Sequence, residues 1–410
     1  MRPLDEVLTE VLSALEPLAP VLLPIADAVG TVLAEAVLAP EDVPPFANTA
    51  MDGYAVRAAD TSGADADSPR RLEVVGDLPA GHPPRDAVGP GQAVRIMTGA
   101  PIPDGADAIV PVERTERDCA SAVLVLAPAA VGDHIRPAGG DASQGSTVFV
   151  PGEVLGPAAI GVLASLARTS VLVHPRPRVA VISTGDELVE GGGPLAPGQI
   201  RDSNRPMICE LVRAAGAIPV DLGIARDDEA VLEARLLAAA AEHDAIVTSG
   251  GVSVGDYDVV KAVLDRIGVL RWSQIAIKPA KPFAFGVIGT TPILGLPGNP
   301  VSSNVSFELL ARPALRRLAG HRDEVRVPVE AVAGEAFDRR NDGKVHYDRV
   351  VVTVDAAGRL RARRSGGQGS NVLTAMARAN GLAVLDDGSG VPAGAAIRVL
   401  LLADPVPEGA

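Results

Sequence analysis

From Arg178 to Leu318 the sequence alternates between short apolar runs and longer amphipathic stretches. The short runs predict strands, and the longer stretches have the apolar spacing of helices. Such alternation favours a mainly parallel sheet with helices on both faces. The expected strands are Val179–Ser183, Ile218–Gly223, Ala245–Thr248 and Ile293–Leu296, and the expected helices are Ser203–Ala215, Asp228–Ala241, Tyr257–Ile267 and Val301–Leu318.

Three polar or glycine-rich loops directly follow expected strands of this sheet. They are Thr184–Glu187, Ser249–Gly251 and Pro297–Asn299. Ligands of open α/β sheets bind at the carboxyl ends of the strands. Because these ends meet at one edge of a parallel sheet, we expect the three loops to line a common binding site.

The chain on either side of this region has a different pattern. Apolar spacing predicts helices within residues 3–19, at Leu22–Val37 and at 154–168, the last packing with the N-terminal helices. Short runs separated by Gly and Pro predict small β modules after Val43 and after residue 323. The expected domains are 1–42 with 140–173 (a discontinuous N-terminal helical module), 43–139 (an inserted β module), 174–322 (the α/β domain) and 323–410 (a C-terminal β module).

Composition excludes several classes of protein. The net charge of −14 argues against a nucleic acid or an anionic membrane as a partner. The two cysteines, Cys119 and Cys209, are too few for a disulfide framework and indicate reduced thiols in the cytoplasm. We expect no signal peptide and no membrane span, because the first residues carry acids and no uncharged apolar run is long enough.

The lysines are unevenly distributed. Of the four lysines in the chain, Lys278 and Lys281 lie three residues apart in a proline-braced run, whereas the other 33 basic residues are arginines. An ammonium group is a compact point charge that suits a small anion, whereas a guanidinium suits planar partners. The alternative is a solvated surface pair, and we favour an oxyanion site.

The run Gly250–Gly255 also indicates anion binding. Glycines after a strand allow backbone N–H groups to surround an anion at the start of the next helix. The spacing matches neither the dinucleotide-binding fingerprint nor a P-loop. An ordinary strand-to-helix turn is an equally good explanation of this run by itself.

Six acidic residues fall at strand ends or in the loops that follow. Asp228 is expected to cap the helix that it precedes. Mg²⁺ binds one or two carboxylates together with phosphate oxygens, so the acids favour a divalent cation, with Glu187 and Asp258 as the preferred ligands. The full set is Asp186, Glu187, Asp227, Asp228, Asp256 and Asp258.

Several motifs, taken in order, resemble those of the molybdopterin molybdenumtransferase (molybdenum insertase) family, which includes the E domain of gephyrin. The resemblance covers nearly the whole chain, and the order of the motifs is more specific than any one of them. The motifs are Met51–Ala55, Met97–Pro101, Ser183–Leu188, Asp202–Asn204, Gly250–Gly255, Lys278–Gly286, Gly295–Ser302 and Ala379–Ala383.

The resemblance implies a fold and a reaction. The fold would be multidomain α/β plus β: a mainly parallel α/β sandwich of the molybdopterin-binding type, the inserted β module, the N-terminal helical module and a β-barrel-like C-terminal module. The reaction would insert molybdenum from molybdate into adenylylated molybdopterin with Mg²⁺ and release AMP. The enzyme would be a cytoplasmic homodimer whose site is shared between protomers, with molybdopterin adenylyltransferase and molybdoenzyme apoproteins as further partners.

The resemblance also assigns roles to residues by their place in the motifs. Lys278, Lys281, Ser302, Arg349 and Ser370 would bind molybdate. Acidic and polar groups would bind the metal, the pterin or the phosphates, with Glu187 and Asp258 as metal ligands. Residues with roles in the reaction would be Asp52, Thr98, Glu187, Asp227, Asp258, Lys278 and Lys281; further substrate-binding residues would be Asp141, Asp186, Ser203, Asn204, Gly250, Gly251, Ser253, Pro297, Asn299 and Pro300.

The sequence departs from the family pattern at two positions of interest. Ala280 stands at the centre of the lysine motif, where glycine is usual, and Gln274 stands where some relatives have lysine. Two alternative functions stay open: molybdopterin adenylyl transfer, which uses the same α/β fold, and a pterin-binding scaffold without turnover. The additional β modules argue against the first alternative, and the intact lysine pair argues against the second.

Overall fold

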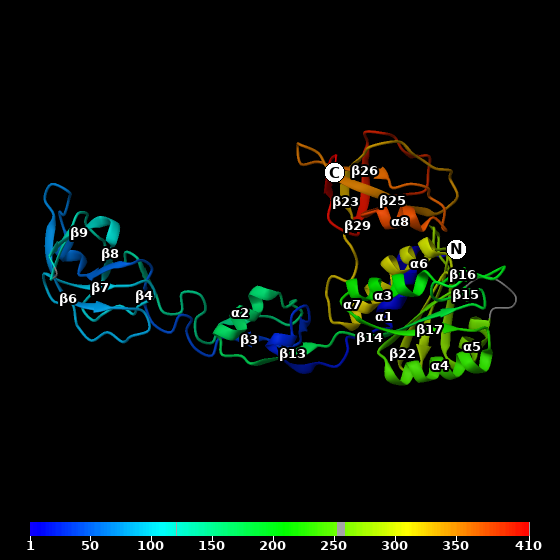
Figure 1. Ribbon diagram of the computed structural model, residues 1–410, viewed down its shortest axis with the longest axis horizontal. Helices are drawn as coiled ribbons and strands as arrows, with labels where there is room; N and C mark the ends of the chain where they lie inside the picture. The colour runs from blue at the N-terminus through cyan, green and yellow to red at the C-terminus, as the bar shows by residue number, and fades with distance from the viewer. Residues whose placement is uncertain (120, 252–258, 410) are drawn as a thin grey trace. The chain divides into compact units, whose positions relative to one another are not determined.

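A computed structural model describes residues 1–119, 121–251 and 259–409 of the 410-residue chain (Figure 1). The chain forms two compact units. The larger unit contains Met1–Ala34, Gly152–Gly156 and Val171–Ala410, and the smaller unit contains Glu35–Pro151 and Pro157–Ser170.

A six-stranded sheet forms the centre of the larger unit, with strand order β17-β14-β18-β22-β21-β19. The first four strands are parallel, and β21 and β19 add an antiparallel edge. The expected mainly parallel α/β sandwich is therefore confirmed. The strands are β14 (Arg178–Thr184), β17 (Ile218–Ala225), β18 (Ala245–Ser249), β19 (Val269–Gln274), β21 (Pro282–Ile288) and β22 (Thr291–Leu296).

Helices cover both faces of this sheet because successive strand residues point to opposite sides. In β14, Val179 and Val181 belong to one hydrophobic core, and Ala180 and Ile182 belong to the other. Figure 1 shows the helices on the two faces. The first core is covered by α1 (Leu4–Ser13), α3 (Asn204–Ala214), α6 (Pro300–Ser306) and α7 (Arg312–Leu318), and the second by α4 (Glu229–Glu242) and α5 (Val259–Ile267).

The segment predicted as one helix at Val301–Leu318 is helical throughout but not uniformly α-helical. A π-helical stretch, Phe307–Ala311, joins α6 to α7. Pro313 lies in the first turn of α7. Proline has no N–H to donate and its ring crowds the preceding turn, so a local change of helical repeat accommodates it.

Five strands close into a barrel in the C-terminal part of the larger unit. Their order is β25-β26-β23-β29-β27, and β27 pairs with β25 to complete the circle. The short strand β20 (Ile277–Lys278) adds to the barrel by parallel pairing with β25. The barrel strands are β23 (Val329–Ala333), β25 (Val345–Val354), β26 (Leu360–Arg364), β27 (Gly381–Leu385) and β29 (Ala396–Leu401), with helix α8 at Leu373–Arg378.

The smaller unit contains another six-stranded sheet, with order β8-β5-β7-β6-β10-β9, and the helix α2 (Pro157–Ser165). Its strands fall within residues 43–139, where short apolar runs predict a β module. They are β5 (Gly53–Val56), β6 (Arg70–Leu78), β7 (Gln92–Ile96), β8 (Ala108–Pro111), β9 (Thr115–Cys119) and β10 (Ala122–Val125).

One expectation about helices is wrong. The segment Leu22–Val37 is not a helix but contains β1 (Val21–Pro24), a 3₁₀ turn and β2 (Val32–Leu33). Proline at position 24 and a positive φ of 79° at Gly30 oppose a continuous helix there. The helix α1 packs against α7 in the larger unit, whereas α2 belongs to the smaller unit.

Among the residues that the structure describes, no helix is both long enough and apolar enough to cross a membrane.

Candidate active site

The three loops after β14, β18 and β22 line one pocket of about 610 Å³, here named the loop pocket. It lies at the carboxyl ends of parallel strands, where the strand order predicts a ligand site. Several residues singled out from the sequence therefore lie together. They are Glu187, Asn204, Asp227, Gly250, Gly251, Pro297, Asn299 and Ser302.

Glycine backbone forms much of the wall of the loop pocket. Gly250 has a φ of +98°, and a Cβ added there would lie 2.8 Å from the carbonyl oxygen of Thr184. At Gly185, with φ +141°, an added Cβ would lie 2.5 Å from Oε2 of Glu187. Both conformations are rarely adopted by residues with side chains, so these glycines permit the close approach of the loops.

Asn204 connects two of the loops. Its Nδ2 donates hydrogen bonds to Ser249 Oγ and to the carbonyl oxygen of Gly298, each at 2.7 Å. Its Oδ1 is buried and has no hydrogen-bond partner among the described residues. An unsatisfied buried acceptor costs free energy, so a ligand donor in the pocket would stabilise this arrangement.

The predicted carboxylates around the loop pocket make different contacts. Asp228 Oδ1 accepts from Val231 N at 3.0 Å, which confirms the predicted cap of α4. Asp186 does not line the pocket, and its Oδ1 accepts from Asp227 N at 3.2 Å. Glu187 and Asp227 line the pocket, whereas Ser253, Asp256 and Asp258 lie outside the described residues.

The donor set of the loop pocket fits Mg²⁺ held together with a substrate. In the described part of the chain, no three His, Cys, Asp or Glu side chains lie close enough to hold a metal ion alone. Glu187 and Asp227 offer two carboxylates, and Mg²⁺ commonly takes only one or two and completes its shell with phosphate oxygens and water.

A second pocket, of about 420 Å³ and here named the barrel pocket, is lined by five lysine and arginine side chains. It lies between the lysine run and the C-terminal barrel, where β20 pairs with β25 and places Lys278 beside His346. Its lining is largely charged, in contrast to the loop pocket. The lining residues are Lys278, Pro279, Asp338, Arg339, Arg340, Asp342, His346, Asp348, Arg349, Arg364 and Gln368.

Two acids of the barrel pocket are neutralised by neighbouring cations. Asp348 pairs with Arg364 at 2.9 Å. Asp342 pairs with Arg339 at 2.9 Å and with Lys344 at 3.6 Å, and it is hydrogen-bonded to Nε2 of His346 at 3.1 Å. Burial would raise the pKa of Asp342, but the hydrogen bond from His346 and the nearby positive charges hold that pKa below its usual range.

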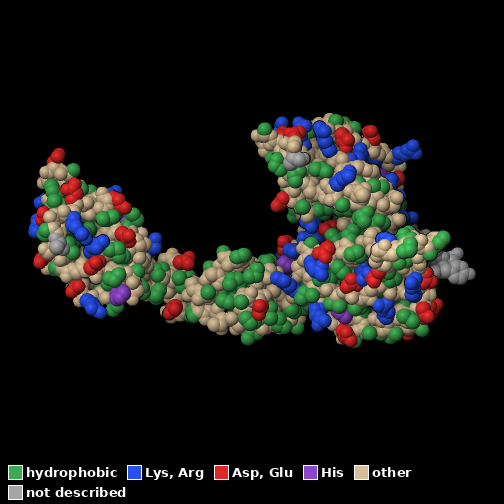
Figure 2. Space-filling view, viewed as in Figure 1, with side chains coloured by type: hydrophobic (Ala, Val, Ile, Leu, Met, Phe, Trp, Pro, Cys, Tyr) green, Lys and Arg blue, Asp and Glu red, His purple; other side chains and the backbone are tan. Residues whose placement is uncertain are grey.

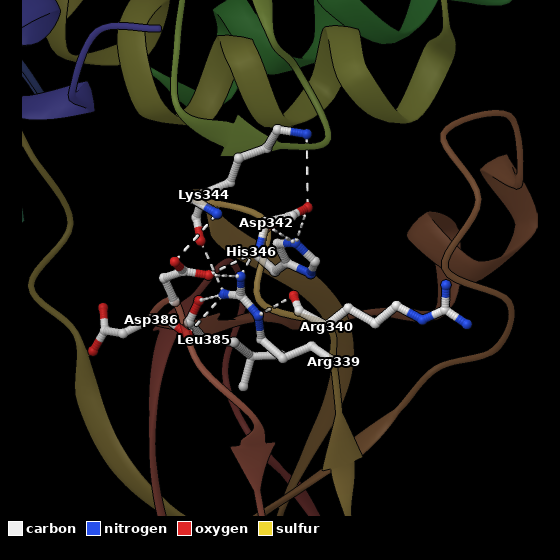
Figure 3. Close-up of polar contacts among 9 residues, drawn as sticks. Arg339, Arg340, Asp342, Lys344, His346, Leu385 and Asp386 are labelled. Carbon is white, nitrogen blue, oxygen red and sulfur yellow. Dashed lines mark hydrogen bonds and ion pairs between the residues drawn. The ribbon is translucent and has the colours of Figure 1, made fainter.

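Arg339 organises this wall of the barrel pocket (Figure 3). Its guanidinium donates to the carbonyl oxygens of Lys344, Leu385 and Asp386, besides its ion pairs. Arg340 is exposed, and in Figure 3 its side chain extends away from the cluster. No ion pair between described residues involves Lys278, Lys281 or Arg340, and Lys278 and Arg340 line the pocket.

Arg349 is a buried cation without a carboxylate partner in the described part of the chain. Its side chain is fully buried, at 1% exposure for the residue, and its Nη2 donates to the carbonyl oxygens of Gly367 and Gly369 at 3.2 and 3.1 Å. Its Nε has no partner among the described residues. Burial lowers the pKa of Arg349, and an anion in the barrel pocket would compensate its charge.

The lysine run lines both pockets. Lys278 and Pro279 face the barrel pocket, and Pro282 lines the loop pocket. Lys281 lines neither pocket. Its residue is exposed, and its carbonyl oxygen accepts from Ile275 N at 2.7 Å. Ala280, at the position where glycine is usual, has a φ of +76°.

The remaining predicted residues lie near these pockets or in the smaller unit. Ser203 precedes α3 and Pro300 begins α6, while Ser370 accepts a hydrogen bond from Val301 N at 3.1 Å. In the smaller unit, Asp52 Oδ1 accepts from both N and Oγ1 of Thr98 at 2.7 Å, and these bonds lower the pKa of Asp52. Asp141, also in the smaller unit, donates its N–H to Val43 O.

The sequence reasoning missed most of the barrel pocket. Arg339, Arg340, His346, Asp348, Arg364 and Gln368 were not predicted as site residues. One signal was available, because His346, Asp348 and Arg349 interrupt an otherwise valine-rich strand. Charged residues in a buried strand require partners or a ligand.

Comparison with protein families matches three consecutive parts of the chain. Residues 2–167 match the MoeA N-terminal region (domain I and II), and residues 180–317 match a probable molybdopterin binding domain. Residues 331–402 match the MoeA C-terminal region (domain IV). Both pockets lie within the part matched by the last two models and the segment between them.

Curated relatives and solved structures agree with these matches. Molybdopterin molybdenumtransferase 2 of Mycobacterium tuberculosis is 42% identical, covering 93% of this chain and 95% of its own. Molybdopterin molybdenumtransferase of Haemophilus influenzae is 36% identical over 97% of this chain and 98% of its own. The molybdopterin biosynthesis MoeA protein of Pyrococcus horikoshii OT3 aligns with a TM-score of 0.83 and 29% identity, covering 98% of this chain and all of that one. The chain therefore belongs to the molybdopterin molybdenumtransferase family.

Proposed function

We propose that this chain is a molybdenum insertase, which transfers molybdenum from molybdate to adenylylated molybdopterin and thereby releases AMP. The proposal combines the family with the chemistry of two adjacent pockets. One pocket offers glycine backbone and carboxylates, which suit phosphates with Mg²⁺. The other offers Lys278, Arg340 and Arg349, which have no carboxylate partner among the described residues and which suit a small oxyanion.

The observation that carries the proposal is the lysine run that lines both pockets. Lys278 lies in the barrel pocket, and Pro282, four residues later, lies in the loop pocket. A fully extended chain spans at most about 3.5 Å per residue, so the two pockets are separated by a short distance along this run. An oxyanion and a pterin phosphate bound in the two pockets would be neighbours.

Some residues of the loop pocket would bind the phosphates, and others would hold the metal that neutralises charge. Gly250, Gly251 and Asn204 would hold the phosphates, and Glu187 with Asp227 would hold Mg²⁺, to which the family resemblance adds Asp258. The metal would neutralise charge on the leaving AMP. Cleavage of a phosphoanhydride depends chiefly on such positioning and electrostatic stabilisation.

We also propose that the enzyme is a homodimer. Helix α2 has no charged residue, yet only Leu163 of its nine residues is buried. Figure 2 shows hydrophobic side chains with few charges over the segment that carries α2. Covering this helix with a second copy would remove apolar surface from water. In such a dimer, Asp52 and Thr98 of one protomer would complete the site of its partner, as the family resemblance implies.

The test is AMP release by purified protein with adenylylated molybdopterin, Mg²⁺ and molybdate. We expect AMP to appear only when molybdate is present. AMP release that is independent of molybdate would contradict the proposal. If binding of the pterin occurs without turnover, the scaffold alternative is correct, and adenylylation of molybdopterin from ATP would instead indicate the adenylyltransferase.

A further inference from the structure

A loop that follows β26 encloses Arg349 at the edge of the barrel pocket. The ladder between β25 and β26 begins at Val350, which pairs with Arg364. One residue further, Ser365 N still donates to Arg349 O at 3.0 Å. The chain then turns away through Gly366, Gly367, Gln368 and Gly369, so no strand continues the ladder beside the N–H of Arg349.

The side chain of Gln368 takes the place of that missing strand. Its Oε1 accepts from Arg349 N at 2.8 Å, and its Nε2 donates to Arg349 O at 3.1 Å. The same Nε2 donates to Gly366 O at 2.9 Å. One amide group therefore bonds to both backbone groups of Arg349 and fixes the turn of its own loop, while the carbonyl oxygen of Arg349 also accepts from N and Oγ of Ser365.

The loop held in this way also fixes the guanidinium of Arg349. The carbonyl oxygens of Gly367 and Gly369, on either side of Gln368, both accept from its Nη2. The two glycines and Gly366 are exposed, so they contribute little packing of their own. The Gln368 amide therefore attaches the loop to the backbone of Arg349, alongside these two bonds to its guanidinium. The Nε of Arg349 is left without a partner in the described part of the chain.

We propose that Gln368 is a positioning residue for the oxyanion: it fixes the loop that aims Arg349 into the barrel pocket. This inference rests on the proposed function. Gln368 acts through Arg349, because its amide already bonds to the backbone of Arg349 and to Gly366. An incorrectly aimed guanidinium loses the directed hydrogen bonds that distinguish it from a diffuse positive charge.

The test is the variant Gln368→Met, which keeps the length of the side chain and removes its hydrogen bonds. We expect the KM for molybdate to rise about tenfold while kcat and the affinity for adenylylated molybdopterin change less than twofold. Equilibrium dialysis against molybdate, without the pterin, should show the same loss of affinity. Gln144→Met is the matched control, because Gln144 makes one side-chain hydrogen bond, to Pro40 O, in the smaller unit.

A double-mutant cycle with Arg349→Gln separates positioning from a general structural effect. In the Arg349→Gln background, we expect Gln368→Met to change molybdate affinity by less than twofold. An unchanged molybdate KM for Gln368→Met, or a full tenfold effect without Arg349, would overturn the inference while leaving the proposed function intact. Absence of molybdate-dependent AMP release by the unmodified chain would instead refute the proposed function.

If Gln368→Met does not fold, Gln368→Glu provides a second test. Its carboxylate can still accept from Arg349 N, but it cannot donate to Arg349 O or Gly366 O, and it competes with an anion for Arg349. We expect a rise in molybdate KM of at least tenfold with the fold retained. An unchanged KM would again overturn the inference.

Discussion

The loop pocket and the barrel pocket lie in the same unit, yet different kinds of chemical groups line them. The loop pocket is formed by glycine backbone and neutral polar groups at strand ends, together with Glu187 and Asp227. The barrel pocket is formed by long charged side chains that are held by one another. The first therefore depends on backbone conformation, and the second depends on the balance of charges.

This difference predicts which substitutions each pocket tolerates and which disrupt it. A pocket of backbone groups should be sensitive to an added Cβ and tolerant of the loss of one side chain. A pocket of mutually paired charges should be sensitive to the loss of the residue that pairs most of them, because the remaining buried groups lose their partners. Four substitutions test this contrast.

The largest effect is expected for Arg339→Ala, which removes the organising cation of the barrel pocket. The change leaves Asp342, Asp387 and three carbonyl oxygens without this partner. We expect a loss of about 3 kcal/mol in the free energy of unfolding, measured by urea denaturation. Arg340→Ala is the control, since its side chain is exposed, and it should change that free energy by less than about 0.5 kcal/mol. Equal effects of the two substitutions would disprove the role of Arg339.

Lys278→Ala should weaken molybdate binding in the barrel pocket and leave pterin binding in the loop pocket intact. Charged hydrogen bonds contribute about 1.5–3 kcal/mol, so the KM for molybdate should rise roughly 10–100-fold. The affinity for adenylylated molybdopterin should change little, because Lys278 lies in the barrel pocket and not in the loop pocket. Lys261→Ala, in α5, serves as the control for the loss of a lysine. A parallel loss of pterin affinity would mean that the pockets are a single site.

Gly250→Ala should disturb the loop pocket through its backbone. The new Cβ would meet Thr184 O at 2.8 Å at a φ of +98°. We expect a cost of about 1–3 kcal/mol in unfolding free energy and weaker binding of adenylylated molybdopterin, measured by calorimetry. Gly192→Ala, where an added Cβ would meet nothing within 4 Å, should change neither quantity. Normal pterin binding by Gly250→Ala would show that the loop tolerates movement.

The smallest effect is expected for Ala280→Gly, in the run between the two pockets. Ala280 is buried and has a φ of +76°, a conformation that glycine adopts without a Cβ penalty. We expect the free energy of unfolding to increase by up to about 1 kcal/mol in urea denaturation. A loss of stability would show that the packing of the Ala280 methyl group outweighs the backbone strain.

Much of the fold and of the loop pocket could be predicted because both follow local patterns. The strands β14, β18 and β22 are short apolar runs, and polar loops follow each of them directly. The segment Leu22–Val37 was misjudged because apolar spacing alone does not register the effects of Pro24 and Gly30. The roles of Ser253 and Asp258 stay predictions, since both lie outside the described residues.

The barrel pocket could not be predicted in the same way because its residues are far apart in the sequence. Lys278 meets His346 only through the parallel pairing of β20 with β25. Gln368 reaches Arg349 only because β26 ends where it does. Neither fact has a local signature.

The sequence by itself determined the parallel sheet and the convergence of three loops at its edge, and it singled out the lysine run as a candidate site. These properties follow from residue type, periodicity and the geometry of consecutive strands. Only the tertiary structure decided which acids of the barrel pocket are neutralised and which of its cations have no carboxylate partner among the described residues. The physical reason is that charge balance depends on distances between side chains, and strand register sets those distances across the barrel.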